Sequence, residues 1–178
     1  MAKLLQIAQL GHPVLRKKAL KINKPIFADV KNLIANMIAT LKDNNGVGIA
    51  APQVYESKRL FILASNPSQR YPDAPKMKPV PIINPKIIKY SGKKKKDWEG
   101  CLSVPGIRAL VPRYLSIKVE YITRDGKKKT KLFKDFVARI FQHEYDHLEG
   151  LVFLDRIETV KDIITEKEYQ KLIAKNTK

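Results

Sequence analysis

Two histidines and a glutamate in the segment 143–147 have the types and spacing that can hold a metal ion. His143, Glu144 and His147 spell H-E-x-x-H. On a helix, positions i and i+4 lie on one face one turn apart, so both imidazoles can reach the same ion. Glu144 lies beside them, where a carboxylate can accept a proton from water that the ion acidifies. The motif therefore predicts a Zn²⁺ or Fe²⁺ site.

A catalytic site of this kind needs a third protein ligand. The longer pattern H-E-x-x-H-x-x-G-x-x-H is excluded, because Phe153 occupies the position of its last histidine. A glutamate from a downstream helix, Glu166 or Glu168, would give a metallopeptidase site, and this alternative stays open. We favour Cys101, the only cysteine, because a thiolate and two imidazoles suit both Zn²⁺ and Fe²⁺.

The surrounding pattern predicts an α+β fold: mostly antiparallel sheets packed around the central metal-binding helix, plus an N-terminal and a C-terminal helix. Apolar residues recur at helical spacing over 30–43 and from Asp135 to Gly150, where Phe136 and Ile140 share a stripe with both histidines. A capping box of Thr165 and Glu168 predicts a helix over 166–176. Strands are expected at 59–65, 82–91, 115–123 and 128–133, with a Pro-rich loop at 69–81.

Length and composition predict one catalytic domain over residues 1–178 of a cytoplasmic protein. A chain of 178 residues suits a single core. It has no long apolar run that would span a membrane. One cysteine allows no internal disulfide, which fits a reducing compartment.

The chain is strongly basic, with 35 Lys and Arg against 17 Asp and Glu and a net charge of +18. Such a charge favours polyanions such as RNA or the ribosome. Lysine predominates over arginine, and its clusters at 93–96 and 127–129 lack interleaved aromatic residues. This pattern does not indicate sequence-specific binding of nucleic acid.

The stretch "GVGIAAPQV" (46–54) fits the loosened dinucleotide fingerprint G-x-G-x-x-A. A phosphate-binding loop of that type follows a strand and opens a helix. Here the order is reversed, because the stretch follows the helix predicted over 30–43 and leads into a strand. We therefore do not interpret the stretch as a cofactor-binding loop.

Three segments together, "GVGIAAPQ", "EGCLSVPG" and "QHEYDHLEG", resemble the peptide deformylase family of bacteria and organelles. The stretches "RALVPR" and "GHPVLRKKA" are also similar to it. The resemblance implies a metal-dependent hydrolase that removes the N-formyl group from nascent formyl-methionyl chains. It favours Fe²⁺ in the cell, with Zn²⁺ or Ni²⁺ in preparations.

The resemblance also implies roles for individual residues. Cys101, His143 and His147 match the metal ligands, and Glu144 matches the general base and acid. The side-chain amide of Gln53 and the backbone N–H of Leu102 match the groups that hold the oxyanion. The substrate-binding set comprises Gly46, Val47 and Gly48 along the peptide backbone, Arg108, and Phe136 and Ile140 in a pocket for the methionine side chain.

Further expectations concern the surroundings of the site. Glu99, Arg113 and Asp146 can form a supporting charge network. Arg139 lies in the same region as Phe136 and Ile140, so the sequence does not decide which side chains line the methionine pocket. The basic C-terminal helix and lysine-rich loops suit docking on ribosomal RNA. A rival function, an RNA-binding protein with a structural metal site, would need a fourth protein ligand that the sequence does not offer.

Overall fold

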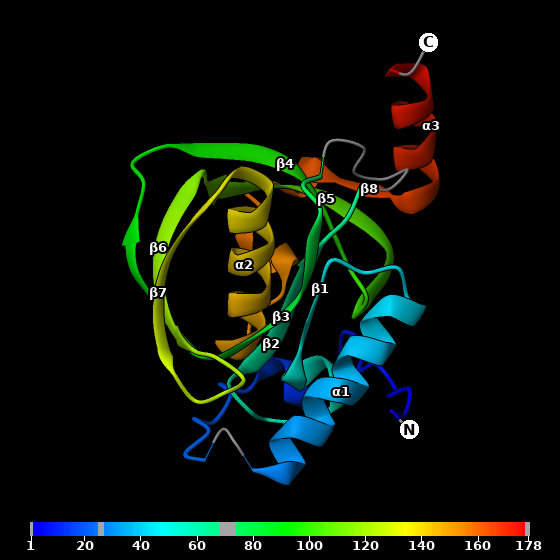
Figure 1. Cartoon of the computed structure of the whole chain (residues 1–178). Helices are drawn as coiled ribbons and strands as arrows, with labels where there is room; N and C mark the ends of the chain where they lie inside the picture. The colour runs from blue at the N-terminus through cyan, green and yellow to red at the C-terminus, as the bar shows by residue number, and fades with distance from the viewer. Residues whose placement is uncertain (1, 25–26, 68–73, 177–178) are drawn as a thin grey trace.

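The computed structural model describes residues 2–24, 27–67 and 74–176 (Figure 1). These residues form three α-helices, eight strands and four short 3-10 helices. In chain order the elements are η1 (Pro13–Arg16), α1 (Ala28–Asp43), β1 (Gly48–Ala50), η2 (Ala51–Val54), β2 (Leu60–Ser65), β3 (Met77–Tyr90), β4 (Lys94–Cys101), β5 (Val104–Tyr114), β6 (Ser116–Ile122), β7 (Lys128–Lys134), α2 (Asp135–Leu148), η3 (Phe153–Arg156), η4 (Val160–Asp162), β8 (Ile163–Thr165) and α3 (Glu166–Asn176).

The strands form two antiparallel sheets with α2 between them, which confirms the predicted α+β class. The larger sheet has the order β1-β2-β3-β6-β7 and the smaller one β4-β5-β8. The central helix α2 contacts β1, β2, β6 and β7 of the larger sheet and β5 of the smaller one (Figure 1). A side chain on α2 can therefore meet groups from both sheets.

At the β2 strand the larger sheet is apolar on both faces, because α1 packs on one face there and α2 on the other. In β2, Phe61 and Leu63 pack in the cluster that contains α2, whereas Leu60 and Ile62 pack in the cluster that contains α1. All six residues of β2 are buried. Burial on both faces explains why this segment reads as a continuous apolar run.

The predicted loop over 69–81 is wrong at its end, because β3 already begins at Met77. This first half of β3 pairs with β2, and β6 joins only from Ile83 onward. Prolines at 79 and 81 are tolerated there because one side of the strand needs no ladder hydrogen bond. A proline within a strand indicates either an edge or a bulge, and the register shift between Ile83 and Lys86 shows a bulge around Pro85.

The smaller sheet was not predicted as such. The lysine cluster at 93–96 lies mostly in β4, whose first residues are exposed, so it is a strand rather than a loop. Exposed lysines hide the apolar alternation that marks a strand. The helices at 135–148 and 166–176 are confirmed, and Gly150 ends the former with φ +77°.

Candidate active site

Three potential metal ligands meet where α2 faces the end of β4. The ligand atoms of Cys101, His143 and His147 all lie within 4.8 Å of one another. Cys101 Sγ is 3.3 Å from His147 Nε2. An ion with bonds of about 2.0–2.3 Å holds its ligands about 3.5 Å apart in tetrahedral geometry, so the donor set fits a divalent metal.

Glu144 lies beside this cluster, packed against the backbone of β1. Its side chain is buried, and Oε2 has no hydrogen-bond partner among the described residues. Burial raises the pKa of Glu144 to about 7. A cation bound nearby would favour the ionised form and lower this pKa. A carboxyl group with a pKa near neutrality can both accept and return a proton.

Gly48 provides the space that Glu144 occupies. A Cβ atom at Gly48 would lie 2.3 Å from Glu144 Oε1 and 2.7 Å from Cδ. A Cβ at Gly46 would meet Leu41 Cδ1 at 2.6 Å. The glycines therefore make room for side chains of the protein itself, in addition to any bound peptide.

Gly48→Ala is expected to lower activity by about a hundredfold, the effect of displacing a catalytic group by about 1 Å. The methyl group must push the Glu144 carboxylate out of its position, while the metal ligands remain in place. Release of formate, the product that the resemblance to deformylases implies, measures the effect in the metal-loaded variant. Gly92→Ala is the matched control, because a Cβ at Gly92 meets nothing within 4 Å. Equal activity of the two variants would contradict the positioning role.

Gln53 reaches the metal cluster from η2. Its Oε1 accepts a hydrogen bond from Ala50 N at 2.8 Å, and this fixes which end of the amide faces Cys101. Its Nε2 lies 3.3 Å from Cys101 Sγ and 3.2 Å from Ser103 Oγ. The amide N–H groups thus point at the cluster. Leu102 lies in the turn between β4 and β5, next to Cys101.

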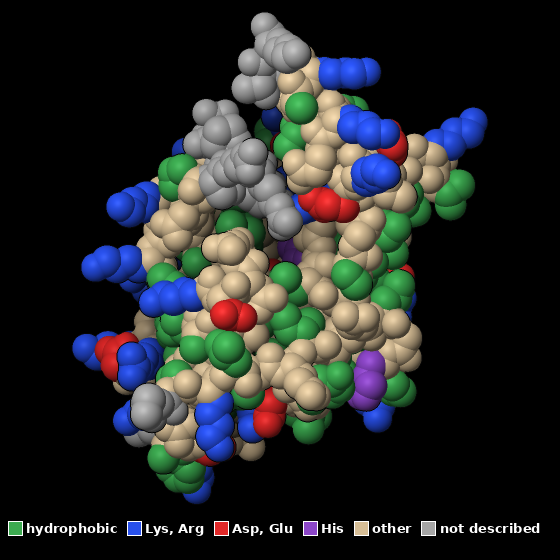
Figure 2. Space-filling view, turned by 90° about the vertical axis from the view of Figure 1, so that its right-hand side faces the viewer, with side chains coloured by type: hydrophobic (Ala, Val, Ile, Leu, Met, Phe, Trp, Pro, Cys, Tyr) green, Lys and Arg blue, Asp and Glu red, His purple; other side chains and the backbone are tan. Residues whose placement is uncertain are grey.

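All predicted site residues except His147 line one pocket of about 630 Å³. This volume lies within the usual range of ligand sites, about 300–1,000 Å³. Histidine is visible at the bottom of a hollow in Figure 2. His147 is fully buried behind the pocket wall. The lining members are Gly46, Val47, Gly48, Gln53, Cys101, Leu102, Arg108, Phe136, Ile140, His143 and Glu144.

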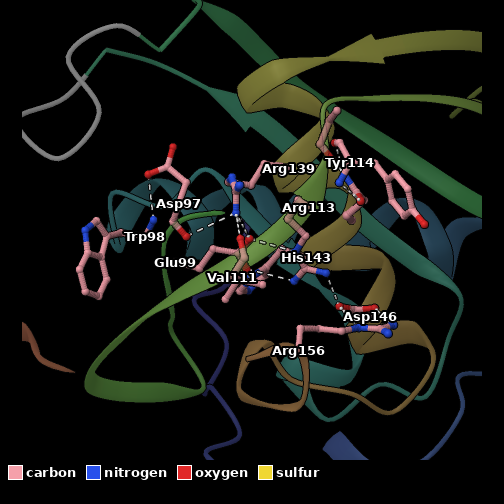
Figure 3. Close-up of polar contacts among 12 residues, drawn as sticks. Asp97, Trp98, Glu99, Val111, Arg113, Tyr114, Arg139, His143, Asp146 and Arg156 are labelled. Carbon is pink, nitrogen blue, oxygen red and sulfur yellow. Dashed lines mark hydrogen bonds and ion pairs between the residues drawn. The ribbon is translucent and has the colours of Figure 1, made fainter. Parts of the chain in front are cut away.

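A buried charge network supports His143 (Figure 3). Glu99 Oε2 accepts from His143 Nδ1 at 2.9 Å and from Arg113 Nη2 at 3.0 Å. Glu99 Oε1 accepts from Arg113 Nε at 3.0 Å and from Arg139 Nη1 at 2.8 Å. A neutral histidine that donates from Nδ1 keeps the Nε2 lone pair free for a metal.

The network predicted from Glu99, Arg113 and Asp146 is thus present, and it is buried. Each of these side chains is only 5% exposed. Burial alone would raise the pKa of Glu99, but Arg113 and His143 hold it well below its usual range. Arg156 also donates to Asp146, which ties η3 to α2. Glu99 thus favours its ionised form, which accepts from His143 Nδ1 and orients the ring towards the site.

Several pocket residues were not found from the sequence. Leu5 and Ile7 line the pocket because Ala8 N donates to Gln53 O at 2.8 Å, and this holds the N-terminal segment against the site. Trp98 also lines it, from β4. The N-terminal segment carries no pattern that would have revealed this role. Recognising the β4–β5 hairpin would have found Trp98.

Known proteins are similar to this chain over most of its length. The family model for polypeptide deformylase matches residues 4–162. The chain belongs to the polypeptide deformylase family. Peptide deformylase 2 of Nostoc sp. is 55% identical over 176 residues, covering 99% of this chain and 98% of that protein. The protein described here is therefore an enzyme, a deformylase that removes the formyl group from nascent peptides.

Solved deformylases have the same fold. The Met-Ala-Ser-bound class I type b peptide deformylase from Acinetobacter baumannii superposes with a TM-score of 0.86 at 44% identity, covering 88% of this chain and all of that one. The peptide deformylase from Thermotoga maritima gives a TM-score of 0.78 at 36% identity, covering 88% of this chain and 99% of that one. The family is metal-dependent, in line with the donor cluster.

The alternative metallopeptidase site has no support. Glu166 is ion-paired with Arg108, its Oε2 lying 2.5 Å from Arg108 Nε. Within the described chain, the group of potential metal ligands comprises Cys101, His143 and His147 and does not include Glu166.

None of the described helices is both long and apolar enough to cross a membrane.

Proposed function

We propose that this deformylase uses Cys101, His143 and His147 to hold one divalent ion and Glu144 to transfer protons at the formyl group of formyl-methionyl chains. The observation that carries the proposal is that Cys101, His143 and His147 bring their ligand atoms within 4.8 Å of one another. Glu144 lines the same pocket as Cys101 and His143. A single catalytic domain over residues 1–178 is part of the same proposal.

The ion would supply Lewis acidity to water and to the formyl oxygen. Glu144 accepts the proton of the attacking water and later delivers it to the leaving amine, and formate departs. The amide N–H of Gln53 and the backbone N–H of Leu102 donate to the oxygen on which negative charge develops. The buried setting strengthens these interactions, because little water competes for them.

Gln53→Ala is expected to retain the metal and to lose about a hundred- to thousandfold in kcat, the usual effect of removing one oxyanion donor. The variant removes the N–H groups beside Cys101 without touching a ligand. Metal analysis and formate release, measured on the same sample, separate the two properties. Turnover equal to that of the unaltered protein would exclude the role of Gln53.

The peptide backbone would bind along β1 as an added strand. Among the described strands β1 pairs with β2 alone, so it forms an edge of the larger sheet. Val47 and Gly48 also line the pocket. Phe136 and Ile140 lie on the α2 side of that pocket, where the methionine side chain would enter. The crystal structure of the A. baumannii deformylase with Met-Ala-Ser supports a peptide ligand at this fold.

We propose Fe²⁺ as the ion in a bacterial cytoplasm, with Zn²⁺ or Ni²⁺ able to replace it in preparations. A thiolate and two imidazoles bind all of these ions, so the donor set alone does not select among them. A thiolate ligand also makes a ferrous site sensitive to oxygen. Anaerobic purification followed by metal analysis tests the assignment.

The decisive test of the proposed function is formate release from a formyl-methionyl peptide, assayed anaerobically. We expect turnover that a chelator abolishes and that Fe²⁺ restores. Absence of formate release by the metal-loaded protein would contradict the function. Turnover that persists in the apoprotein would contradict the metal role.

The basic surface is proposed to bring the enzyme to the ribosome, near the exit of the nascent chain. Basic side chains project from the top of the molecule in Figure 2, where Figure 1 places α3. Counterion release predicts that affinity for ribosomes falls steeply with salt. Cosedimentation with ribosomes at increasing salt measures this. Binding independent of salt, or no binding, would exclude electrostatic docking.

A further inference from the structure

A buried arginine in the pocket wall is held by an acid from the C-terminal helix. Arg108, in β5, lines the pocket, and its side chain is 5% exposed. Its Nε lies 2.5 Å from Glu166 Oε2, and its Nη2 lies 3.4 Å from Glu166 Oε1. Glu166 also lines the pocket, with 29% of its side chain exposed. The cation and its counter-charge therefore both face the site where the peptide would bind.

Contacts with three elements keep the Arg108 guanidinium in this place. A Cβ atom at Gly100 would lie 2.6 Å from Arg108 Nη1, so the glycine allows the arginine to cross β4. The Tyr169 ring lies over the guanidinium, 5.1 Å from its centroid to Arg108 Cζ. β8 pairs with β5 and sets Ile164 opposite Arg108, which brings the start of α3 to the pocket. Groups of the protein itself thus hold the arginine in the pocket wall.

We infer that Glu166 is a specificity-determining residue, which neutralises Arg108 so that the pocket does not select peptides carrying a carboxylate near the formyl group. An isolated buried cation attracts an anion, whereas a paired one does not. Short formyl peptides end in a free terminal carboxylate, but a growing chain has no terminal carboxylate close to its start. Neutralising Arg108 thus keeps short anionic peptides from being favoured over growing chains. The inference rests on the proposed deformylase site.

The counter-charge comes from a segment outside the family match. The family model ends at residue 162, whereas Peptide deformylase 2 of Nostoc sp. aligns over 99% of this chain. Glu166 is the first residue of α3. Indifference to negative charge on the substrate is therefore a property of the C-terminal segment of this chain, whereas Arg108 lies within the family match.

The test compares formyl-Met-Ala-Ser with its C-terminal amide as substrates of the metal-loaded enzyme. We expect the unaltered enzyme to give similar kcat/KM for the two. In Glu166→Gln, the ratio of acid to amide should rise roughly three- to tenfold, the effect of one partly screened charge. The rise in the ratio should come from a lower KM for the acid, and it should be smaller at high salt. Glutamine keeps an oxygen that can accept from Arg108, so α3 can stay docked.

Two matched variants control the result. Glu168→Gln makes the same change on α3 at an exposed residue paired with Lys171, and it should leave the ratio unchanged. The double variant Arg108→Gln with Glu166→Gln removes both charges and should restore the original ratio.

An unchanged ratio in active Glu166→Gln overturns the inference, as does an equal rise in Glu168→Gln. Failure of the unaltered enzyme to release formate from the amide would instead contradict the proposed site itself. The two failures are therefore distinguishable.

Discussion

Replacing Glu144 by glutamine is expected to lower kcat for formate release by about a hundred- to ten-thousandfold, the usual contribution of a general acid–base group. Glutamine has nearly the same shape, so it can pack against Gly48 in the same way. It cannot accept the proton of water at neutral pH. The metal should remain bound, because the potential ligands Cys101, His143 and His147 are untouched.

Metal content and single-turnover formate release, measured on the same preparation of Glu144→Gln, check this expectation. Glu120→Gln is the matched control, since it makes the same chemical change at an exposed residue of β6. The control should retain full activity. A metal-loaded Glu144→Gln enzyme that kept more than a small fraction of kcat would exclude Glu144 as the proton-transfer group.

The second large effect is expected for Cys101→Ala, which should lose its metal and its activity together. Removing a side chain that only hydrogen-bonds to a metal ligand already lowers metal affinity about ten- to hundredfold, and removing a ligand itself should lower it more. Glu166→Ala should retain the ion, because Glu166 is paired with Arg108 and lies outside the ligand cluster.

Metal analysis after anaerobic dialysis distinguishes the two variants. Circular dichroism shows whether Cys101→Ala remains folded, which is expected because the change removes one small side chain at the end of β4. The reverse pattern, with Glu166→Ala empty and Cys101→Ala loaded, would favour a metallopeptidase-type site.

The local elements could be predicted where one periodicity dominates. The helix at 135–148 was found because Phe136, Ile140, His143 and His147 recur at helical spacing. In the structure, Ile140, His143 and His147 of this stripe are buried. The strand β2 was found as an apolar run. The strand β4 was missed because exposed lysines and one tryptophan do not alternate visibly, although pairing with β5 makes the segment a strand.

The sequence by itself determined the chemistry that this protein can perform. The residue types and spacing of H-E-x-x-H, a single cysteine and the order of three motifs limited the site to a small set of donors and to one family. These features are local, and a ligand pair at i and i+4 depends only on the geometry of the helix that carries it.

Only the tertiary structure decided how these groups are held. Glu99 and Arg113 come from the smaller sheet, yet Glu99 accepts from His143 on α2 at 2.9 Å and from Arg113 at 3.0 Å in a buried network. Gly48 proved to leave room for Glu144, and Glu166 proved to be the partner of Arg108. Such contacts join residues far apart in the chain. They depend on how two sheets pack around one helix, and no local pattern encodes that packing.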